Sequence, residues 1–402
     1  MPEFDIVVAG GGPAGLQFAR EIGSQSSYSV AVLERNAALA DNDKSTGGTF
    51  HQVIDGYDVP DRVVMDSSPD VIFEGPSASE TLPIPNYVLD FPAFVEFLGA
   101  DAATAGTVEL HRNTRVAEPL TDGGRVTGVR AHRDGGTVDY HADVVVDATG
   151  PAGVLTSELG MWDPDAAQRG IGKEYEVAGS FDCDSMLFNF DHEFAPGGYA
   201  WTFPGGDGVF KIGVCWVDDF YERHRPSAQR GIDSYIEAWI EHDDRWTVED
   251  VRAVHAGTAV VDNSINQRAA DGIVAVGDAV SSINPLFGEG IRPGMESAEM
   301  AAGTVLDALR AGDTSRERLA QYEARWNREK GSKWKTQRMI GELLYDFDAE
   351  QQDRFVRNAG DLSAAQAERL QRYELTLSDL VGLYPFKLKD VPKAPTLFRH
   401  VR

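Results

Sequence analysis

Three glycines and one carboxylate near the start of the chain have the types and spacing that bind a phosphate-linked ligand. Gly10, Gly12 and Gly15 form a G-x-G-x-x-G pattern between an apolar run at 4–9 and a helical pattern. The first glycine permits a tight turn, the second lets a pyrophosphate approach the backbone, and the third lets helix pack against strand. Glu34 ends the next apolar run, where a carboxylate meets ribose hydroxyls. The pattern predicts a bound dinucleotide, against the alternative of a glycine-rich surface turn.

A second stretch, residues 271–302, has the same kind of organisation. The apolar run 273–276 reads as a buried parallel strand that stops at Gly277 and Asp278. A loop follows with the sequence Gly-Glu-Gly-Ile at 288–291, and a helical pattern then runs to about residue 309. At such a helix start, backbone N–H groups and the helix dipole face a bound anion. We expect this stretch to hold an anionic cofactor.

Two further turns contain small residues that would let a ligand approach the backbone. The polar loop 42–49 holds two adjacent glycines, Gly47 and Gly48, although an ordinary flexible loop is the alternative interpretation. The apolar run 143–147 reads as a buried strand and is followed by Ala148-Thr149-Gly150. Small residues at this strand end allow contact with a molecule that lies across the sheet.

The segments that must position these motifs alternate between strand and helix patterns. We expect strands at 4–9, 29–33, 107–110, 114–118 and 143–147, and helices at 16–22 and 91–105. Residues 125–132 and 136–140 predict a hairpin around Asp134 and Gly135. The strand–helix–strand order at the start of the chain is typical of an α/β fold.

The rest of the chain has a different pattern. Residues 173–217 alternate like antiparallel strands and are rich in aromatic side chains. An amphipathic helix is expected at 232–240. After the second glycine-rich stretch the pattern predicts helices at 316–330, 341–355 and 364–380, and an extended tail at 385–402.

The chain is strongly acidic. Its 402 residues include 64 Asp and Glu against 37 Lys and Arg, which gives a formal net charge of −27. Because the acids are spread along the whole length, we expect an acidic folded surface, as in a high-salt cytoplasm, with a basic partner protein as the alternative. We expect no nucleic-acid partner, since the sequence has no basic stripe to neutralise phosphates.

The cysteines and the hydropathy pattern indicate the cellular compartment to expect. Cys183 and Cys215 form neither a C-x-x-C pair nor a zinc spacing, so we expect buried, reduced thiols. No grouping of His with Asp or Glu has metal-ligand spacing. No apolar run approaches the roughly 18 residues of a transmembrane helix, and no signal-peptide pattern precedes the first strand. We therefore expect a cytoplasmic protein with membrane contact, if any, only peripheral.

The two glycine-rich stretches, taken as a pair, resemble those of flavoprotein hydroxylase-type (p-hydroxybenzoate hydroxylase-like) enzymes, and Thr149-Gly150 matches the Ala-Thr-Gly strand end of that group. The resemblance implies an α/β fold with a Rossmann-like FAD-binding domain, an antiparallel β-sheet substrate domain and a C-terminal helical region. It also implies a single FAD bound by both stretches. The implied FAD-binding domain comprises 1–50, 91–160 and 256–312, the substrate domain 51–90 and 161–255, and the helical region 313–402.

The middle of the chain points to one family within this group of flavoproteins. The sequence from Tyr199 to Trp216 is similar to the Tyr-x-Trp-x-Phe-Pro…Gly…Val-Gly pattern of the geranylgeranyl reductase family, and 285–291 is similar to its PLxGEGI loop. Archaeal members of this family saturate the prenyl chains of ether lipids, so the resemblance implies an FAD-dependent reductase. Ser45 and Thr46 depart from the family, since many relatives have a Cys and a small residue there. An Arg that reaches the cofactor in relatives is also missing between 62 and 112.

The candidate site residues come from the motifs and the resemblance together. Those expected to bind the cofactor are Gly10, Gly12, Pro13, Ala14, Gly15, Glu34, Arg35, Ser45, Thr46, Gly47, Gly48, Val116, Thr149, Gly150, Gly277, Asp278, Gly288, Glu289, Gly290 and Ile291. A long apolar substrate suits a tunnel lined by aromatic residues, because each buried CH₂ contributes ~0.8 kcal/mol. The candidate substrate-binding residues are Phe188, Phe190, Tyr199, Trp201, Phe203, Trp216 and Phe287. Tyr199 and Phe287 are also candidates for a catalytic role. For each aromatic residue, a place in an ordinary sheet core is the alternative.

Three functions are compatible with these features. The leading hypothesis is a reductase of geranylgeranyl lipids with FAD as cofactor and a ferredoxin-type protein or NAD(P)H as electron donor. The second is a monooxygenase, or an isoprenoid cyclase or dehydrogenase, on the same fold. The third is a non-catalytic prenyl-binding protein, which the intact Glu34 and Gly277-Asp278 disfavour because such proteins tend to lose the flavin contacts.

Overall fold

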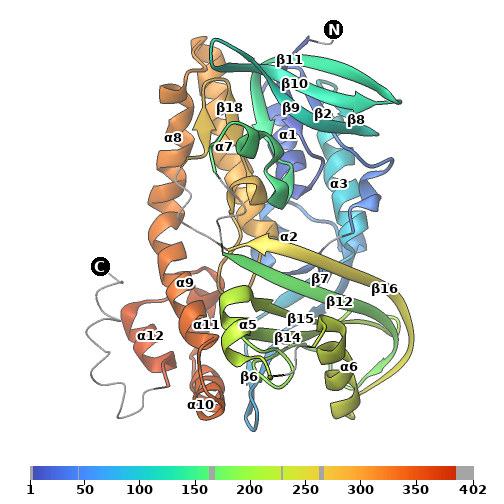
Figure 1. The fold of residues 1–402 in the computed structure, drawn as a ribbon, viewed down its shortest axis with the longest axis vertical. Helices are drawn as coiled ribbons and strands as arrows, with labels where there is room; N and C mark the ends of the chain where they lie inside the picture. The colour runs from blue at the N-terminus through green and yellow to red at the C-terminus, as the bar shows by residue number, and fades with distance from the viewer. Residues whose placement is uncertain (1–2, 44, 163–167, 228–229, 262–266, 386–402) are drawn as a thin grey trace. The chain divides into compact units, whose positions relative to one another are not determined.

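The computed structural model describes residues 3–43, 45–162, 168–227, 230–261 and 267–385 (Figure 1). Two compact units account for the chain. The first unit comprises 1–43, 91–167 and 259–332, and the second comprises 44–90, 168–258 and 333–402. The three-part domain division expected from the sequence stays a prediction. All but the first residue of the predicted tail at 385–402 lies outside the described residues.

A parallel sheet with the strand order β17-β18-β11-β1-β2-β8 forms the centre of the first unit. Its strands are β1 (Glu3–Ala9), β2 (Val30–Leu33), β8 (Val108–His111), β11 (Gly136–Asp147), β17 (Ala269–Ala270) and β18 (Ile273–Ala275). Along this order, all neighbours are parallel except β17, which pairs antiparallel with β18. The strands are apolar because both faces of a parallel sheet are covered.

Strand β11 belongs to two pairings at once. Residues 136–141 pair antiparallel with β10 (Arg125–Arg133), which also pairs with β9 (Thr114–Asp122), whereas 141–147 pair with β1. The hairpin at Asp134 and Gly135 is confirmed, with φ of 51° and 76° at these residues. The expected break between 140 and 143 is wrong, because the strand changes partners at His141 without interruption.

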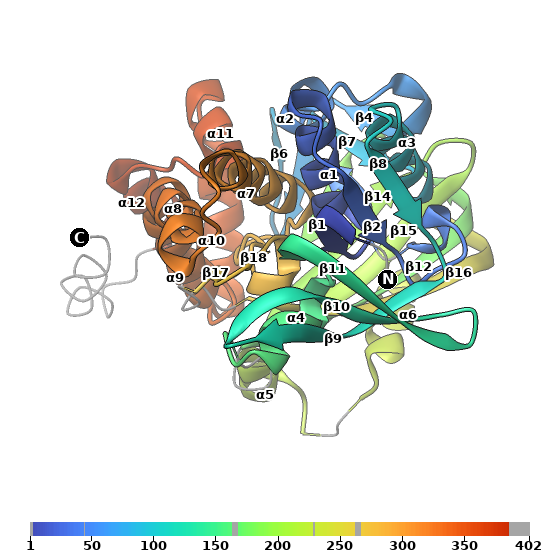
Figure 2. The ribbon, with the colours of Figure 1, turned by 90° about the horizontal axis from the view of Figure 1, so that it is seen from above.

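Helices pack against this sheet and against one another. They include α1 (Pro13–Gln25), α3 (Phe91–Ala103), α4 (Val154–Glu158), α7 (Ile291–Ala311) and α8 (Arg316–Trp326). Helix α1 lies beside α7 (Figure 2). It begins three residues earlier than predicted, because Pro13 at the first helical position has its φ preset and needs no N–H partner there.

The second unit contains a seven-stranded sheet in the order β16-β12-β15-β14-β13-β5-β6. The strands are β5 (Val71–Glu74), β6 (Ser79–Leu82), β12 (Arg169–Phe181), β13 (Met186–Asn189), β14 (Gly198–Pro204), β15 (Val209–Val217) and β16 (Trp246–Val260). A smaller sheet is formed by β3 (Gly48–Thr49), β4 (Val64–Ser68) and β7 (Asn86–Leu89), with α2 (His51–Gly56) following β3. The antiparallel strands predicted within 173–217 are confirmed, while β5 joins them through a parallel pairing with β13.

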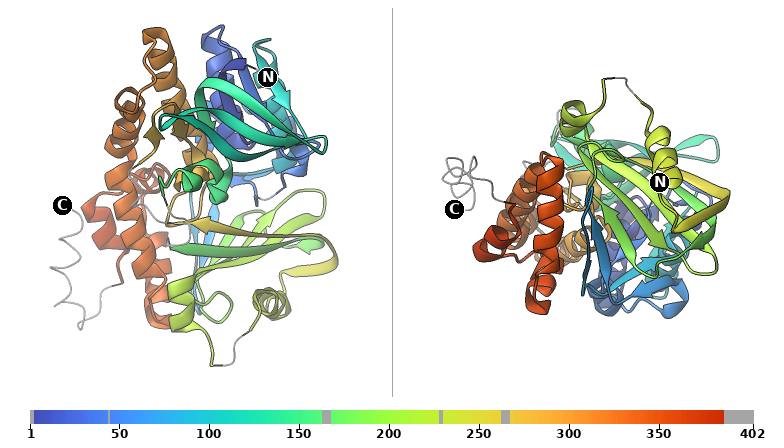
Figure 3. Two further views of the ribbon diagram at one scale, coloured as in Figure 1. Left: turned by 45° about the horizontal axis from the view of Figure 1, so that its top comes forward. Right: turned by 90° about the horizontal axis from the view of Figure 1, so that it is seen from below.

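One face of the seven-stranded sheet is covered by α5 (Asp218–His224) and α6 (Ile232–His242) (Figure 3). Ile212 and Val214 of β15 are buried against Trp239 of α6 in a shared apolar cluster. Because side chains alternate along a strand, Lys211 and Gly213 belong to the opposite face. One face is therefore closed by α5 and α6, and the side chain of Lys211 on the opposite face is buried as well.

The C-terminal helices are confirmed, but their boundaries differ from the prediction. Helix α8 continues through a π-helical turn (Asn327–Gly331) into α9 (Ser332–Leu344), and α10 (Ala349–Gly360), α11 (Ala364–Gln371) and α12 (Leu377–Leu383) follow. The predicted helix 364–380 is two helices, because Tyr373 has a φ of 59° and Thr376 caps the next helix with its side chain. None of the described helices has both the length and the apolar character needed to span a bilayer.

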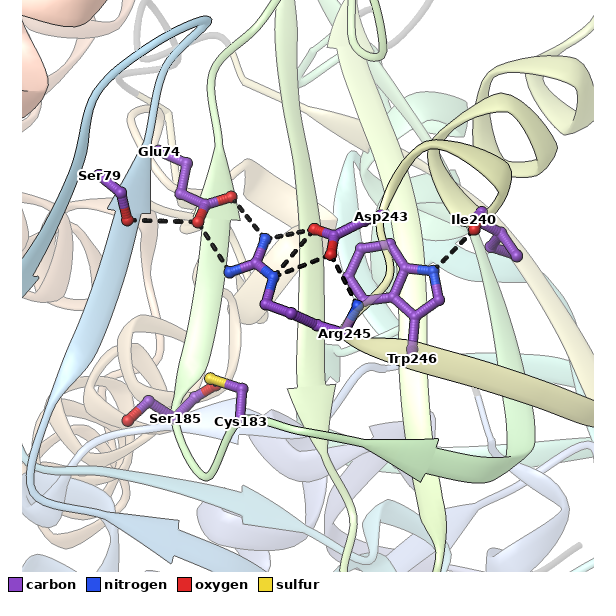
Figure 4. A network of polar contacts seen from close by, with 8 residues as sticks. All are labelled: Glu74, Ser79, Cys183, Ser185, Ile240, Asp243, Arg245 and Trp246. Atoms are coloured by element: carbon purple, nitrogen blue, oxygen red, sulfur yellow. Dashed lines mark hydrogen bonds and ion pairs between the residues drawn. The ribbon is translucent and has the colours of Figure 1, made fainter.

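Arg245 ties three parts of the second unit together (Figure 4). Its guanidinium donates to both oxygens of Glu74 on β5, at 2.8 and 3.0 Å, and to both oxygens of Asp243 beyond α6. The next residue, Trp246, begins β16 and donates its indole N–H to Ile240 O at 3.0 Å. The planar fork of arginine fits two carboxylates in a way that a lysine ammonium does not.

We expect Arg245→Lys to lower the free energy of unfolding by about 1–2 kcal/mol, because the paired hydrogen bonds to Glu74 and Asp243 are lost. Denaturant unfolding at one fixed salt concentration measures the change. Arg225→Lys is the matched control, since Arg225 makes a single bond to the exposed Glu222 at 2.8 Å and the change should stay within about 0.5 kcal/mol. Equal losses in both variants would contradict the role assigned to the fork.

Candidate functional site

The carboxyl edge of the parallel sheet collects most of the predicted cofactor residues. Strands β18, β11, β1 and β2 are neighbours in that order, and they run in the same direction. Each ends at a predicted motif, so the glycine turn, Glu34, Thr149-Gly150 and Gly277-Asp278 come together in the first unit. Crevices beyond the carboxyl ends of parallel strands are where α/β proteins bind ligands.

The three glycines of the first motif differ in what surrounds them. A Cβ on Gly10, where φ is 114°, would lie 2.2 Å from Ala148 O, and one on Gly15 would lie 2.1 Å from Gly10 O. A Cβ on Gly12 would meet only the Asn42 amide, at 3.7 Å. Gly10 and Gly15 are therefore fixed by close packing, while Gly12 leaves its backbone open at the uncapped N-terminus of α1.

Glu34 holds the glycine turn in place. Its side chain is buried, and its two carboxylate oxygens accept hydrogen bonds from Gly11 N at 2.8 Å and Asn36 N at 2.9 Å. The neighbouring Arg35 is exposed. Each oxygen of Glu34 has a second lone pair, so the contact to ribose hydroxyls predicted from the sequence is compatible with this structural role.

The end of β11 is organised by Asp147, which the sequence analysis did not select. The fully buried carboxylate accepts from Thr149 N at 3.0 Å and Thr149 Oγ1 at 2.6 Å, and from Leu155 N and Thr156 N at 3.0 and 2.8 Å. Burial raises the pKa of Asp147, while these hydrogen bonds oppose the rise. One acid thus fixes Thr149, Gly150 and the start of α4. The available signal in the sequence was an acid directly after three valines at the end of β11.

Asp278 has a buried carboxylate oxygen that no described residue hydrogen-bonds. Gly277 takes a φ of 59°, and a Cβ there would lie 2.8 Å from that of Ala14 on α1. Asp278 Oδ1 is inaccessible to solvent and has no hydrogen-bond partner among the residues that the structure describes. Burial raises the pKa of Asp278 to about 6. A buried acceptor without a donor is costly unless a ligand supplies one.

The second motif continues into the N-terminus of α7. Gly290 is the N-cap residue and offers no side chain, so the N–H groups of the first turn, beginning with Ile291, keep their capacity to donate. Gly288 has a φ of 66°, and Glu289 pairs with the buried Arg292 at 3.1 Å. Phe287 lies in this loop, where its N–H donates to Asn284 Oδ1 at 3.1 Å. Phe287 thus belongs to the first unit.

These features fit a dinucleotide such as FAD. Two uncapped helix N-termini suit a pyrophosphate, the space at Gly12 admits it, and the orphaned Asp278 oxygen suits a hydroxyl donor. Val116, another predicted cofactor residue, lies on β9, and its side chain is buried in the apolar core of the first unit. Its contact with the cofactor stays a prediction.

The remaining predicted cofactor residues, 45–48, belong to the second unit. Gly47 has a φ of 80°, and its carbonyl accepts from Leu89 N at 2.9 Å. A Cβ on Gly48 would lie 2.6 Å from the Phe203 ring. The two glycines pack closely against residues of this chain, and the predicted approach of a ligand to their backbone stays a prediction.

Five of the predicted substrate residues gather on one face of the seven-stranded sheet. The ring of Phe188 lies 5.7 Å from Tyr199 and 5.2 Å from Phe203, measured between centroids. Tyr199 also lies 5.9 Å from Trp201 and 6.4 Å from Phe190. Burial, with the adjacent Cys215 thiol, keeps the pKa of Tyr199 well above its usual value, so its hydroxyl holds its proton.

Trp216 is not part of this face. It stacks on Tyr221 of α5, with 4.3 Å between ring centroids, inside the helix-covered cluster. The register explains the difference, because Tyr199 pairs with Cys215 and Trp216 pairs with Gly198. Neighbouring positions on a strand point to opposite faces.

Comparisons with known proteins agree with this arrangement. Residues 169–261, which include the aromatic face, match the geranylgeranyl reductase catalytic domain. A digeranylgeranylglycerophospholipid reductase of Haloferax volcanii is 34% identical over 380 residues, which is 91% of each chain.

Two solved structures share the fold. A geranylgeranyl bacteriochlorophyll reductase-like protein of Thermoplasma acidophilum aligns with a TM-score of 0.86 and 20% identity over 99% of this chain and all of that one. A halogenase in complex with FAD aligns with a TM-score of 0.67 and 15% identity, covering 92% of this chain and 82% of that one. The predicted fold, that of FAD-dependent enzymes, is confirmed. With a relative this similar along nearly its whole length and a matching catalytic domain, the chain belongs to the geranylgeranyl reductase family.

Proposed function

We propose that the chain is an FAD-dependent oxidoreductase that saturates carbon–carbon double bonds in the geranylgeranyl chains of archaeal-type glycerophospholipids. The observation that carries the proposal is the aromatic face inside 169–261, the segment that matches the family's catalytic domain. Phe188, Tyr199, Trp201 and Phe203 place four rings side by side there. A prenyl chain has no group for ion pairing, so apolar burial of about 0.8 kcal/mol per CH₂ is its main source of affinity.

The first unit supplies the proposed FAD site. The N-terminus of α1 and the open backbone at Gly12 would take the pyrophosphate, Glu34 the adenosine ribose, and Asp278 a hydroxyl of the ribityl side. The N-terminus of α7 at Gly290 and Ile291 adds further N–H donors. When bound and reduced, FAD supplies a hydride to one carbon of the alkene.

Residues of the chain have the tasks of positioning the alkene and supplying the second hydrogen as a proton. The aromatic face orients the apolar chain and excludes water. Tyr199 has a hydroxyl on this face and retains its proton, so we assign it to orienting or protonating the alkene. The sequence holds one G-x-G-x-x-G motif, which suits an electron donor that binds transiently, either a ferredoxin-type protein or NAD(P)H.

Reduction of a lipid by chemically reduced protein tests the activity without knowledge of the donor. We expect anaerobic incubation of the FAD-loaded, dithionite-reduced protein with geranylgeranyl glycerophospholipid to add the mass of two hydrogen atoms for each double bond, as detected by mass spectrometry. Protein that lacks FAD, treated identically, is the control. An FAD-loaded protein that leaves the lipid mass unchanged would refute the proposal.

The pH dependence of stability tests the orphaned acid. Because the pKa of Asp278 is about 6 without cofactor, against an ordinary 3.8, the folded state binds the proton more tightly than the unfolded state. Its contribution to stability therefore falls as pH rises from about 4 to about 6, by at most about 3 kcal/mol. Asp278→Asn should remove this fall, so the variant gains stability relative to the parent protein across the window.

Urea unfolding of cofactor-free protein at several pH values measures the effect. Asp122→Asn changes an exposed acid of the same unit and should follow the parent curve. Hydroxyl donors from bound FAD favour the carboxylate, so added FAD should flatten the parent curve and should bind Asp278→Asn at least about tenfold more weakly. Parallel curves for the parent and Asp278→Asn would count against the assignment.

Two glycines beside Trp201 give a matched test of the aromatic face. A Cβ on Gly213 would lie 2.1 Å from the Trp201 ring, whereas one on Gly172 would meet its nearest atom at 3.6 Å. We expect Gly213→Ala to displace the indole and lower kcat/KM for lipid reduction by about tenfold, or about 1.4 kcal/mol. Gly172→Ala should stay within about twofold in the same steady-state assay. Similar losses in both would show that the position of Trp201 does not matter.

A further inference from the structure

Lys211 is a buried lysine on the aromatic face of the second unit. Its side chain is 2% exposed, although it carries an ammonium group. The Nζ atom donates to Thr46 O at 3.1 Å and lies 4.0 Å from Glu176 Oε2. A buried ion costs several kcal/mol unless partners compensate it, so a lysine used merely to fill space is a poor choice here.

Cross-strand register places Lys211 in a defined array. Glu176 of β12, Lys211 of β15 and Phe203 of β14 form one row across the sheet. The next row on the same face consists of Glu174, Gly213 and Trp201. One cation thus stands beside two carboxylates and two aromatic rings.

Glu174 connects the two rows. It is 4% exposed, and its Oε2 accepts from the Trp201 indole N–H at 2.8 Å. It also receives a hydrogen bond from the Thr46 side chain, and the charge of Lys211 acts on it across the face. The same carboxylate therefore contacts the loop on one side and the indole on the other.

Thr46 is consequently held by both of its polar groups, the carbonyl by Lys211 and the hydroxyl by Glu174. Two residues later, Gly48 packs against Phe203 in the row of Lys211. Gly47 is anchored from the other side, because its carbonyl accepts from Leu89 N at 2.9 Å. The loop is clamped between β7 and the charged end of the aromatic face.

We infer that Lys211 and Glu174 are positioning residues that lock the Thr46–Gly48 loop to the Trp201 indole. In functional terms the inference rests on the proposed function, since 45–48 are the proposed cofactor loop and Trp201 is part of the proposed substrate face. The pair keeps these two elements in one fixed relation. It works through Thr46, which contacts both residues.

Hydrogen–deuterium exchange of the intact protein tests the lock directly. Lys211→Met should speed exchange in peptides that cover 45–50 by roughly tenfold, because the loop loses a charge-assisted bond and Glu174 loses its nearby cation. The matched control is Lys173→Met, which removes an ion-paired lysine from β12 that bonds Asp233 at 2.5 Å on the helix-covered side. That control should leave exchange at 45–50 unchanged.

Three further variants test whether the faster exchange comes from the loss of the contacts of Lys211 and Glu174 with Thr46. Lys211→Arg keeps a buried cation and should restore most of the slow exchange. Lys211→Met combined with Glu174→Gln should perturb the loop less than Lys211→Met alone, because the double variant buries no uncompensated carboxylate. If Lys211→Met does not fold, Thr46→Ala tests the same lock through the hydroxyl, with a smaller but measurable acceleration confined to 45–50.

Exchange at 45–50 that is the same in Lys211→Met, Thr46→Ala and Lys173→Met would overturn the inference. Acceleration spread evenly over the whole second unit would also overturn it, because a local lock predicts a local effect. In the lipid assay, Lys211→Met should raise KM at least about fivefold, and Lys173→Met should leave it unchanged. A protein that shows the local exchange effect but never reduces lipid would retain the lock and refute the proposed function instead.

Discussion

The common direction of β18, β11, β1 and β2 is the constraint on which the first unit depends. Because these neighbours are parallel, their carboxyl ends lie along one edge, and every residue that follows a strand there competes for the same space. Only glycine fits at position 10, because a Cβ there would lie 2.2 Å from Ala148 O. Acids then hold the turns: Glu34 bonds the glycine turn, and Asp147 bonds the loop after β11. Asp278 differs from these two acids, because its Oδ1 has no hydrogen-bond partner among the described residues.

In the second unit, the two faces of the seven-stranded sheet differ in their side chains. Strand alternation makes this possible, because β15 sends Ile212, Val214 and Trp216 toward α5 and α6 and Lys211 and Gly213 the other way. The helix-covered face supplies the apolar burial that stabilises the sheet. The other face carries aromatic rings and the buried network of Lys211.

Sequence predicted what depends on short-range pattern. The G-x-G-x-x-G turn, the strand ends and the aromatic strands were all found, since each is encoded within about ten residues. Asp147 and Lys211 were missed because their partners are defined by tertiary structure: Lys211 bonds a carbonyl 165 residues away. Trp216 was grouped with Tyr199 because the register between β14 and β15 was unknown. With Tyr199 paired to Cys215, alternation separates the two rings.

Charge has a different meaning at the surface and in the interior of this chain. The net charge of −27 is the acidic balance expected of a folded surface at high salt, where the screening length falls to roughly 3 Å. Exposed pairs such as Arg225–Glu222 then contribute little. Buried groups are screened far less, so Lys211 beside Glu174 and the uncompensated Asp278 keep their full electrostatic effect. Substitutions of these buried groups should therefore change the stability of the chain at high salt more than substitutions of exposed ion pairs do.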